Sequence, residues 1–390
     1  MTLPPHLMLS GRSFANEWEF LCLSATHHAI QSGTISDVRV NLDWEILLEL
    51  AEEHGVLGIL ATRLRALGYR GVPAEAREKL QRQMRAQHLF TLSMTAELFR
   101  IVDHFKQAGI PTILVKGPLI SLLAYGDPAV RSYVDLDLLV SHSQILPATQ
   151  RMMEMGFEPD IPISVIETRK VPGEYLFKRA GTKQIIELHT ERTFRYYPRP
   201  MPLNELFARK REVLLDGQKI PALALEDEFI LNSIHGAKHF WERLMWVSDI
   251  AALVGSHPEI NWNLLRIHAG DVGAERMIHL ALQLAETVLK APIPKAMEQE
   301  VRRDRAALEL CERVVRWLPS AGYAPPKLRE RALFRMRMRG GRLAGAAYLA
   351  RLSFSPTEED WVEGKEENRS WLADAVQRPM RLLRKYRSDR

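Results

Sequence analysis

The segment ILVKGPLISLLAYGDPAVRSYVDLDLLV, residues Ile113 to Val140, decides the fold because it joins two apolar runs through a glycine turn. The first run, Ile113 to Val115, ends in Lys116-Gly117, and a short helical segment is expected directly after this turn. The second run carries Asp135 and Asp137. The segment therefore predicts the order strand, glycine turn, helix, acidic strand.

The two aspartates of the second run have the spacing of a metal clamp. Side chains alternate across a strand, so Asp135 and Asp137 should share one face while Val134, Leu136 and Leu138 pack behind them. Two carboxylates this close repel each other, and Mg²⁺ cancels that repulsion while leaving positions open for water and phosphate oxygens. An Asp-x-Asp pair alone is common and often structural. Its position after the Lys-Gly turn favours the metal site.

The turn itself has the features of an anion site. Gly117 followed by Pro118 is typical of a tight turn into a helix, whose first amide groups and dipole attract anions. Lys116 adds a point charge for phosphate, and Arg131 can bind two phosphate oxygens at once. For Arg131, an ion pair with Asp127 or another surface acid is the alternative interpretation.

A third acidic position follows in IIELHTE, residues Ile185 to Glu191. Alternation places Glu187 and His189 on one face of this strand, so Glu187 is the candidate third carboxylate. His189 could orient that carboxylate, touch the substrate, or be a structural residue of a half-buried strand. Glu191 shares the same face, so the assignment could shift by one pair.

The stretch HGAKHFWERLMWVSDIAAL, residues 235–253, gathers further polar side chains on a predicted helix. His235 and His239 lie one helical turn apart, as do Lys238 and Glu242. Read alone, the histidine pair could bind zinc, but the helix lacks the His-Glu-x-x-His order of a metalloprotease and has no evident third ligand. The aromatic and acidic positions that follow are Trp246 and Asp249.

Taken together, these motifs resemble the polymerase-β-like nucleotidyltransferase core. More closely, they resemble a bacterial nucleotidyltransferase family that pairs a Lys-Gly turn with a later Asp-x-Asp and continues with His-x-x-Lys-His-x-Trp and Trp-x-x-Asp-Ile. The resemblance covers roughly Thr91 to Leu253. The chain departs from the Gly-Gly or Gly-Ser turn of the broader superfamily.

The resemblance implies a metal-dependent transferase that passes a nucleoside monophosphate from ATP, GTP, CTP or UTP to an acceptor hydroxyl and releases pyrophosphate. It also implies Mg²⁺ or Mn²⁺ as cofactor and a third acid that positions the attacking hydroxyl or takes its proton. The implied catalytic and metal-binding residues are Asp135, Asp137 and Glu187; the nucleotide-binding residues are Lys116, Gly117, Arg131 and Lys238; the supporting residues are His189, His239 and Asp249.

Two other functions fit parts of the sequence. A regulatory protein could keep this scaffold and bind a nucleotide without turnover, although the retained acids argue against it. Nucleic-acid binding through the arginine-rich C-terminal helices is the weakest hypothesis, because no aromatic residues alternate with the arginines in a stacking pattern. The acceptor, whether a protein, a sugar or a small molecule, cannot be read from these motifs.

Composition narrows the class of protein. With 390 residues and 46% hydrophobic side chains the chain can bury a full core, and its net charge of +5 and pI near 9.1 fit either a polyanionic ligand or solvated helix faces. Only Cys22 and Cys311 are present, so a reducing cytoplasm is expected. Because neither a signal-like start nor eighteen successive apolar residues occur, we expect no membrane span.

The expected fold is α+β: a polymerase-β-like core with a small mixed sheet, flanked by N- and C-terminal helical regions. The predicted divisions are residues 1–90, helical; 91–225, the nucleotidyltransferase core; and 226–390, helical. Periodicity predicts helices over 42–67, 73–109 and 144–155, strands over 175–178 and 184–189, and a hairpin over 212–223. An exposed connection is expected over 353–366, and the basic stretches 329–342 and 378–390 could form amphipathic helices on an acidic partner or simply solvated helix faces.

Overall fold

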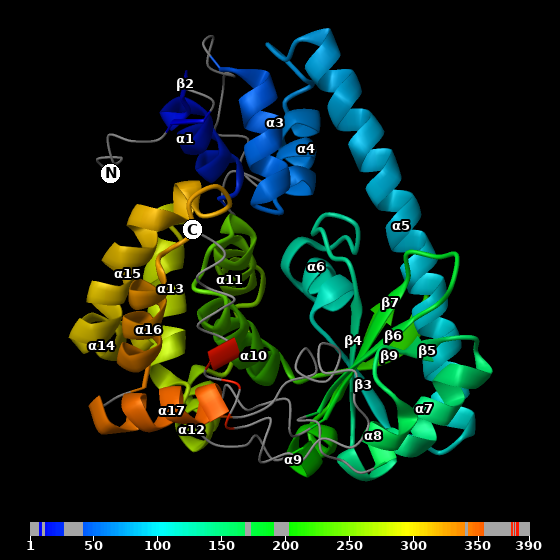
Figure 1. Ribbon diagram of the computed structural model, residues 1–390. Helices are drawn as coiled ribbons and strands as arrows, with labels where there is room; N and C mark the ends of the chain where they lie inside the picture. Colours follow the sequence, from blue (N-terminus) through cyan, green and yellow to red (C-terminus); the bar gives the residue numbers. More distant parts are fainter. Residues whose placement is uncertain are drawn as a thin grey trace.

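The computed structural model describes residues 8–9, 12–26, 42–167, 173–190, 203–339 and 342–354, together with residues 376, 378, 380 and 381. Within these residues the molecule combines a seven-stranded mixed sheet with many helices, so the predicted α+β class is confirmed (Figure 1). Glu191, most of the expected connection over 353–366 and most of the basic tail lie outside the described residues.

The sheet follows the order β5-β6-β7-β4-β3-β9-β8. Its two central pairs place the segments of interest side by side, because β3 and β4 are antiparallel whereas β4 and β7 are parallel. A separate two-stranded pair joins β1 and β2 near the N-terminus. The strands are β1 Met8–Leu9, β2 Arg12–Ser13, β3 Thr112–Val115, β4 Leu136–Val140, β5 Glu158–Pro159, β6 Glu174–Lys178, β7 Ile185–His189, β8 Arg211–Leu215 and β9 Gln218–Ala222.

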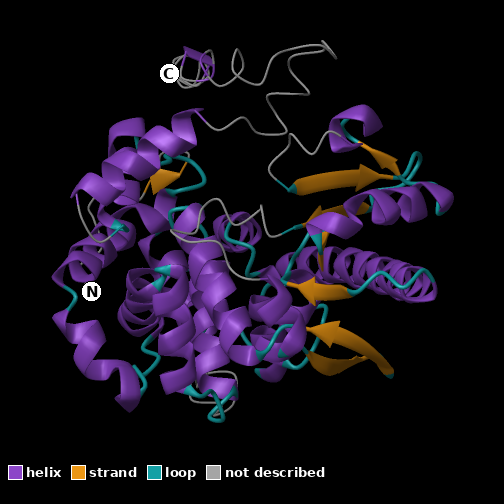
Figure 2. Ribbon diagram, turned by 90° about the horizontal axis from the view of Figure 1, so that it is seen from below, coloured by secondary structure: helices purple, strands orange, loops and turns teal. Residues whose placement is uncertain are grey.

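Helices surround the sheet and build the rest of the molecule. Figure 1 shows the long α5 beside the seven-stranded sheet and α13 to α16 on the opposite side of the molecule. Figure 2 shows the strands of this sheet gathered in one part of a mainly helical structure. The helices are α1 Ala15–Ser24, α3 Trp44–Glu53, α4 Leu57–Ala66, α5 Ala74–Gln107, α6 Gly117–Tyr125, α7 Ile145–Glu154, α8 Ile163–Glu167, α9 Leu203–Ala208, α10 Leu225–Lys238, α11 Leu244–Ser256, α12 Trp262–Val272, α13 Glu275–Leu289, α14 Lys295–Arg303, α15 Arg305–Trp317, α16 Leu328–Arg337 and α17 Arg342–Phe354.

The predicted order of strand, turn, helix and acidic strand is present as β3, Lys116-Gly117, α6 and β4. β4 begins at Leu136, however, two residues later than expected, because Val115 pairs with Asp137 at the end of β3 and Lys116 then turns away with a φ of 52°. Asp135 therefore lies in the bend before β4. Val134 does not pack behind the acids, since it is 67% exposed.

The helix predicted across residues 235–253 is also interrupted. α10 ends at Lys238 because Phe240 and Trp241 both adopt positive φ angles, 57° and 55°. The buried Trp241 ring packs where a side chain at Gly236 would lie, so the turn is held by close contact as well as by the Trp241 N–H bond to the Gly236 carbonyl. Glu242 therefore lies beyond the end of α10, so Lys238 and Glu242 are not neighbours on one face of a continuous helix.

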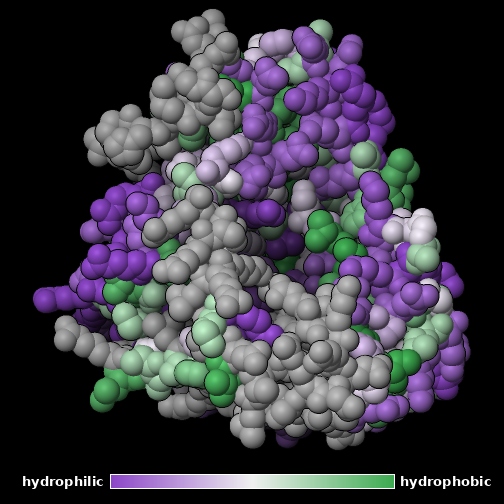
Figure 3. All heavy atoms as spheres, viewed as in Figure 1, coloured by the Kyte–Doolittle hydropathy of each residue, from purple (hydrophilic) through white to green (hydrophobic). Residues whose placement is uncertain are grey.

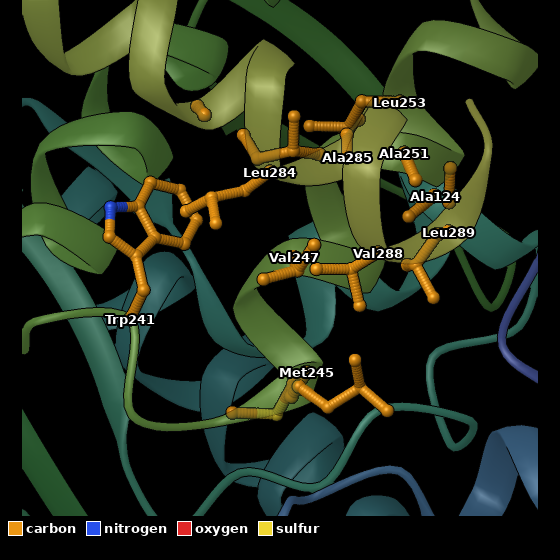
Figure 4. Close-up of a cluster of buried hydrophobic side chains, with 14 of the residues drawn as sticks. Ala124, Trp241, Met245, Val247, Ala251, Leu253, Leu284, Ala285, Val288 and Leu289 are labelled. Atoms are coloured by element: carbon orange, nitrogen blue, oxygen red, sulfur yellow. The ribbon is translucent and has the colours of Figure 1, made fainter. Parts of the chain in front are cut away.

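The buried apolar side chains form two clusters. One lies around the sheet, between α5, α7 and the strands. The other joins the N-terminal helices to α6, α10, α11 and α13. Figure 4 shows part of this second cluster, where Ala124 of α6 lies among Ala251 and Leu253 of α11 and Val288 and Leu289 of α13. This packing fixes α11 and α13 against the end of α6.

Candidate functional site

The centre of the candidate site is formed where β4 and β7 run side by side. Asp137 on β4 is in register with Glu187 on β7, so both side chains project from the same face of the sheet. His189 follows two residues after Glu187 on that face. Ligand atoms of Asp137, Glu187 and His189 all lie within 4.8 Å of one another. The expectation that Glu187 lies on the same side of the sheet as Asp137 is met by this geometry.

Asp137 is the most heavily engaged of these carboxylates. Its Oδ1 accepts a hydrogen bond from Lys116 Nζ at 2.9 Å and lies 2.6 Å from His189 Nε2. The same His189 nitrogen lies 3.2 Å from Glu187 Oε2. Both contacts to Asp137 are made by Oδ1, so they leave the second carboxylate oxygen for another partner.

The charges of this group are strongly coupled. Burial opposes ionisation of Asp137, but the positive charges of Lys116 and His189 outweigh it and hold the pKa of this carboxyl below its usual range. Burial likewise opposes protonation of His189, yet Asp137 raises the pKa of the imidazole to about 9. For Lys116 the same balance, burial against Asp137, raises the pKa to about 12. The three side chains therefore form a buried, charged network at neutral pH.

Asp135 lies at the edge of this network. Burial, followed by the negative charges of Asp137 and Glu187, raises the pKa of the Asp135 carboxyl to about 7. Its carboxylate does not belong to the tight group formed by the other acids and His189. Neighbouring carboxylates oppose the ionisation of such a carboxyl, and a bound divalent cation would offset this repulsion.

The Lys-Gly turn abuts the acidic bend. Gly117 has a φ of 41°, and a Cβ added there would lie 3.5 Å from the Asp135 carbonyl oxygen and 3.8 Å from the Tyr133 ring. The Lys116 N–H points away from this contact and donates to Glu228 Oε1 at 3.2 Å. Glu228 is fully buried in the first turn of α10, and it was not among the residues predicted from the sequence.

Arg131 is held by a second buried network. Its Nε donates to Asp249 Oδ2 at 2.7 Å, and Tyr125 donates its hydroxyl to Asp249 Oδ1 at 2.9 Å. Arg131 is only 5% exposed. Its ion pair is with Asp249 and not with Asp127, the alternative partner considered from the sequence. Instead, Asp127 Oδ1 accepts the Ala129 N–H. Asp249 is thus brought to the site through Arg131.

The end of α10 and the start of α11 contribute a wall of rings. The His235 and His239 rings have centroids 4.6 Å apart, and Trp246 stacks on His239 at 5.2 Å. Burial, then the charge of Lys238, lower the pKa of His239 to about 3. Burial, His239 and Lys116 lower the pKa of His235 well below its usual value. Both imidazoles are therefore neutral at physiological pH. Lys238 reaches Glu174 Oε1 at 3.4 Å.

The acids, the Lys-Gly turn, Arg131 and the rings line one cleft of about 990 Å³, whereas Tyr125, Glu228 and Asp249 lie behind its surface. Its walls come from the sheet, the start of α6, the α10–α11 turn, α3 and α5. Figure 3 shows a hollow near the middle of this face, with hydrophilic residues above it and some hydrophobic residues on its right. The predicted residues that line the cleft are Lys116, Gly117, Arg131, Asp135, Asp137, Glu187, His189, Lys238 and His239. This volume is at the upper end of small-molecule sites, which are roughly 300–1,000 Å³.

The donor set fits a hard divalent cation. Asp137 and Glu187 offer carboxylate oxygens at one point of the cleft, and Asp135 lines the same cleft outside that group. Oxygen ligands of this kind suit Mg²⁺ and Mn²⁺. No comparable group of three or more His, Cys, Asp or Glu ligands occurs elsewhere among the described residues. Among the described residues, no third His, Cys, Asp or Glu lies close enough to His235 and His239 to complete a zinc site.

Two contributors escaped the sequence predictions. Tyr125 ends α6 in an apolar pattern, and nothing local indicates that its hydroxyl meets an acid in α11. Glu228 carried a weak signal, because it stands among the apolar residues of a buried helix face. An acid on such a face needs a partner, but the sequence does not show that the partner is the Lys116 amide.

Comparison with known proteins agrees with the sequence motifs. No curated protein matches the chain. Among solved structures, an antigenic nucleotidyltransferase-like protein from Paracoccidioides brasiliensis shares 18% sequence identity, covering 54% of this chain and 94% of its own, with a TM-score of 0.30. The family model described as "Uncharacterised nucleotidyltransferase" matches residues 41–290 of the 390. With more than half of its length matched, the chain belongs to this family of uncharacterised nucleotidyltransferases.

Proposed function

We propose that the protein transfers a nucleoside monophosphate from a nucleoside triphosphate to an acceptor hydroxyl or similar group and releases pyrophosphate. The observation that carries this proposal is the register of Asp137 with Glu187 on neighbouring strands, beside Asp135 and the Lys116-Gly117 turn in one cleft. Family membership supports nucleotidyl transfer in general. The substrate, the metal and the residue roles are our proposal.

Asp135, Asp137 and Glu187 are the residues that would hold Mg²⁺ or Mn²⁺. When bound, the cation would neutralise charge on the phosphate oxygens and orient the triphosphate for in-line displacement. Two carboxylates in close proximity and a third in the same cleft suit the chemistry of such a site. The pKa of Asp135, which is raised by burial and then by the charges of Asp137 and Glu187, supports it because a cation there would offset those charges. His189 keeps Asp137 and Glu187 at fixed positions through its Nε2.

We expect the triphosphate to bind beside the Gly117 N–H and the positively charged side chains of the cleft. Gly117 offers a backbone N–H at the start of α6, where the helix dipole favours an anion. Arg131 supports phosphate binding through its terminal nitrogens, because its Nε is already engaged by Asp249. Lys116 and Lys238 bring two further positive charges into the same cleft. Charge stabilisation and positioning by these groups would supply most of the rate.

Glu187 has the position of the residue that receives the acceptor. Its side chain is partly exposed, at 26%, whereas that of Asp137 is 6% exposed, so Glu187 is the more accessible of the two carboxylates. We assign it the task of orienting the acceptor hydroxyl and taking its proton as the oxygen attacks the α-phosphate. The hydroxyl proton then resides on Glu187, and pyrophosphate leaves.

The order β3, α6, β4 with a third acid on β7 also supports a polymerase-β-like core. We retain residues 91–225 as that core and residues 1–90 and 226–390 as flanking helical regions. For the described residues, no helix is long and apolar enough to cross a membrane.

The reaction can be tested without knowing the acceptor. The purified protein is mixed with each of ATP, GTP, CTP and UTP, labelled at the α-phosphate, with Mg²⁺ or Mn²⁺, and with proteins, sugars or small molecules as acceptors. We expect pyrophosphate release and a labelled product from wild type, and a loss of at least about a hundredfold in Asp137→Asn and Glu187→Gln. Asp160→Asn is the matched control, because Asp160 is an acid of the same region that pairs with Lys178 outside the cleft.

If wild type consumes none of the four nucleotides and binds neither metal, the proposal is wrong. A second candidate, a nucleotide-binding regulator without turnover, is favoured by one specific observation. Lys116 and His189 already neutralise Asp137, which lessens its need for a metal. Tight nucleotide binding without product, together with unchanged binding in Glu187→Gln, would favour this regulator.

A further inference from the structure

We infer that Glu228 is a positioning residue of the site: its buried carboxyl oxygen holds the Lys116-Gly117 turn in the shape that receives phosphate. This inference rests on the proposed function, since the shape of the turn matters for binding only if phosphate docks there. Glu228 itself does not line the cleft, so it acts through Lys116 and not by touching substrate.

The contact joins two segments that are far apart in the sequence. Glu228 Oε1 accepts the Lys116 N–H at 3.2 Å and the Asn232 side-chain amide at 3.0 Å. Asn232 also donates to the Glu228 carbonyl at 2.7 Å, so the carboxyl is steadied by its own helix. Glu228 is 0% exposed, and burying a carboxyl in this way is costly without such partners.

The turn needs a partner of this kind because Lys116 adopts a φ of 52°, which side-chain-bearing residues seldom adopt. In this conformation the Lys116 N–H points back to Glu228. Pro118 has no N–H, and those of Leu119 and Ile120 donate to the Lys116 carbonyl. The Gly117 N–H is therefore the backbone donor left at the start of α6. By accepting the Lys116 N–H, Glu228 leaves the Gly117 N–H as the backbone donor that faces the cleft.

The same arrangement keeps the Lys116 side chain on the cleft side, where its Nζ reaches Asp137. Lys116 thus links three parts of the site. Its N–H donates to Glu228 of α10, its ammonium donates to Asp137 of β4, and its carbonyl accepts the first hydrogen bonds of α6. Burial raises the pKa of the Glu228 carboxyl to about 7, against the opposing effect of the Lys116 amide. An uncharged amide at this position can accept the same hydrogen bond.

The neighbouring Asp227 provides a matched control. It is also fully buried in the first turn of α10, but its carboxylate pairs with Arg209 at 2.5 and 2.9 Å and does not reach the turn. Loss of either acid disturbs the same helix. Loss of Glu228 alone should disturb phosphate binding.

The test measures binding of Mg²⁺-tripolyphosphate and of each nucleoside triphosphate by calorimetry, with Mn²⁺ binding alone as a second readout. We expect Glu228→Ala to weaken tripolyphosphate and nucleotide binding roughly tenfold, which corresponds to one hydrogen bond of about 1.4 kcal/mol. Mn²⁺ affinity should be unchanged, and Glu228→Gln should restore binding. Asp227→Asn should lower the melting temperature but keep tripolyphosphate affinity within about twofold of wild type. Should Glu228→Ala fail to fold, Glu228→Asp replaces it, because its shorter side chain withdraws the accepting oxygen.

Unchanged binding in Glu228→Ala or Glu228→Asp overturns the inference, as does an equal loss in Asp227→Asn. An equal loss in Glu228→Gln also overturns it, because the accepting oxygen would not be what holds the turn. If wild type binds neither tripolyphosphate nor any nucleotide, the proposed function fails first and the inference fails with it.

Discussion

Asp249→Asn tests the network that holds Arg131 in the cleft. Arg131 is 5% exposed and Asp249 1% exposed, and the 2.7 Å contact between them joins the α6–β4 connection to α11. Asparagine keeps the size of the side chain but removes its charge. The guanidinium of Arg131 would then remain buried without its counterion, which is the costly way of breaking such a pair.

The size of the effect follows from burial. Removing one partner of a buried ion pair costs about 3–5 kcal/mol. Unfolding entropy of about 2.1 cal/mol/K per residue gives on the order of 0.8 kcal/mol/K for this chain of 390 residues. The melting temperature should therefore fall by roughly 4–6 °C. The KM for nucleotide should rise as well, because the terminal nitrogens of Arg131 lose their fixed orientation.

Thermal unfolding and nucleotide kinetics are measured together, with Glu97→Gln as the matched control. Glu97 is buried and holds Arg179 through two bonds of 2.8 Å outside the cleft. Its loss should lower the melting temperature by a similar amount without changing the KM. A melting temperature within 1 °C of wild type for Asp249→Asn would mean that Arg131 does not depend on this counterion. An equal rise of KM in the control would mean that the effect is not specific to the cleft.

Three further predictions concern the acids and the turn. The folded pKa of His189 is about 9, above its ordinary 6.5, so its stabilisation is complete below pH 6.5 and is lost as the pH rises through 9. The metal-free protein should accordingly melt lower at pH 9 than at pH 6.5, and a slope unchanged in His189→Gln would contradict this. If Asp135 is a metal ligand, Mn²⁺ displaces the proton of this carboxyl, whose pKa is about 7. Calorimetry should then show that Mn²⁺ releases protons and binds more tightly as the pH rises through 7. An affinity independent of pH would argue against Asp135 as a ligand. Gly117→Ala places a side chain at a φ of 41°, so denaturant titration should show a loss of roughly 1–2 kcal/mol, and no loss would mean that the turn relaxes freely.

The local pattern of the sequence was sufficient for the elements that carry the acids. Alternation placed Glu187 and His189 on one face, and the Lys-Gly turn between two apolar runs predicted β3, α6 and β4. These features depend on neighbours in the chain. The start of β4 could not be predicted in this way, because it depends on where β3 ends and leaves Asp135 without a strand partner.

The supporting contacts depend on tertiary packing. Lys116 meets Glu228, and Asp249 meets both Arg131 and Tyr125, across more than a hundred residues of sequence. They arise because α11 packs on α6 and α10 packs on α11, and helical periodicity does not specify which polar groups then meet. The sequence could therefore identify the candidate ligands of the metal and phosphate and the supporting residues His189 and Asp249, but not Tyr125 or Glu228, nor which groups these buried residues contact.

We expect Asp137 and Glu187 to bind a divalent cation together with a nucleoside triphosphate. The most direct measurement is a crystal structure of the protein with Mn²⁺ and an α,β-nonhydrolysable nucleotide, with data collected at the manganese absorption edge. An anomalous peak is expected within bonding distance of carboxylate oxygens of Asp137 and Glu187 and of a phosphate oxygen. A nucleotide bound in the cleft with no such peak beside these two carboxylates would contradict this expectation.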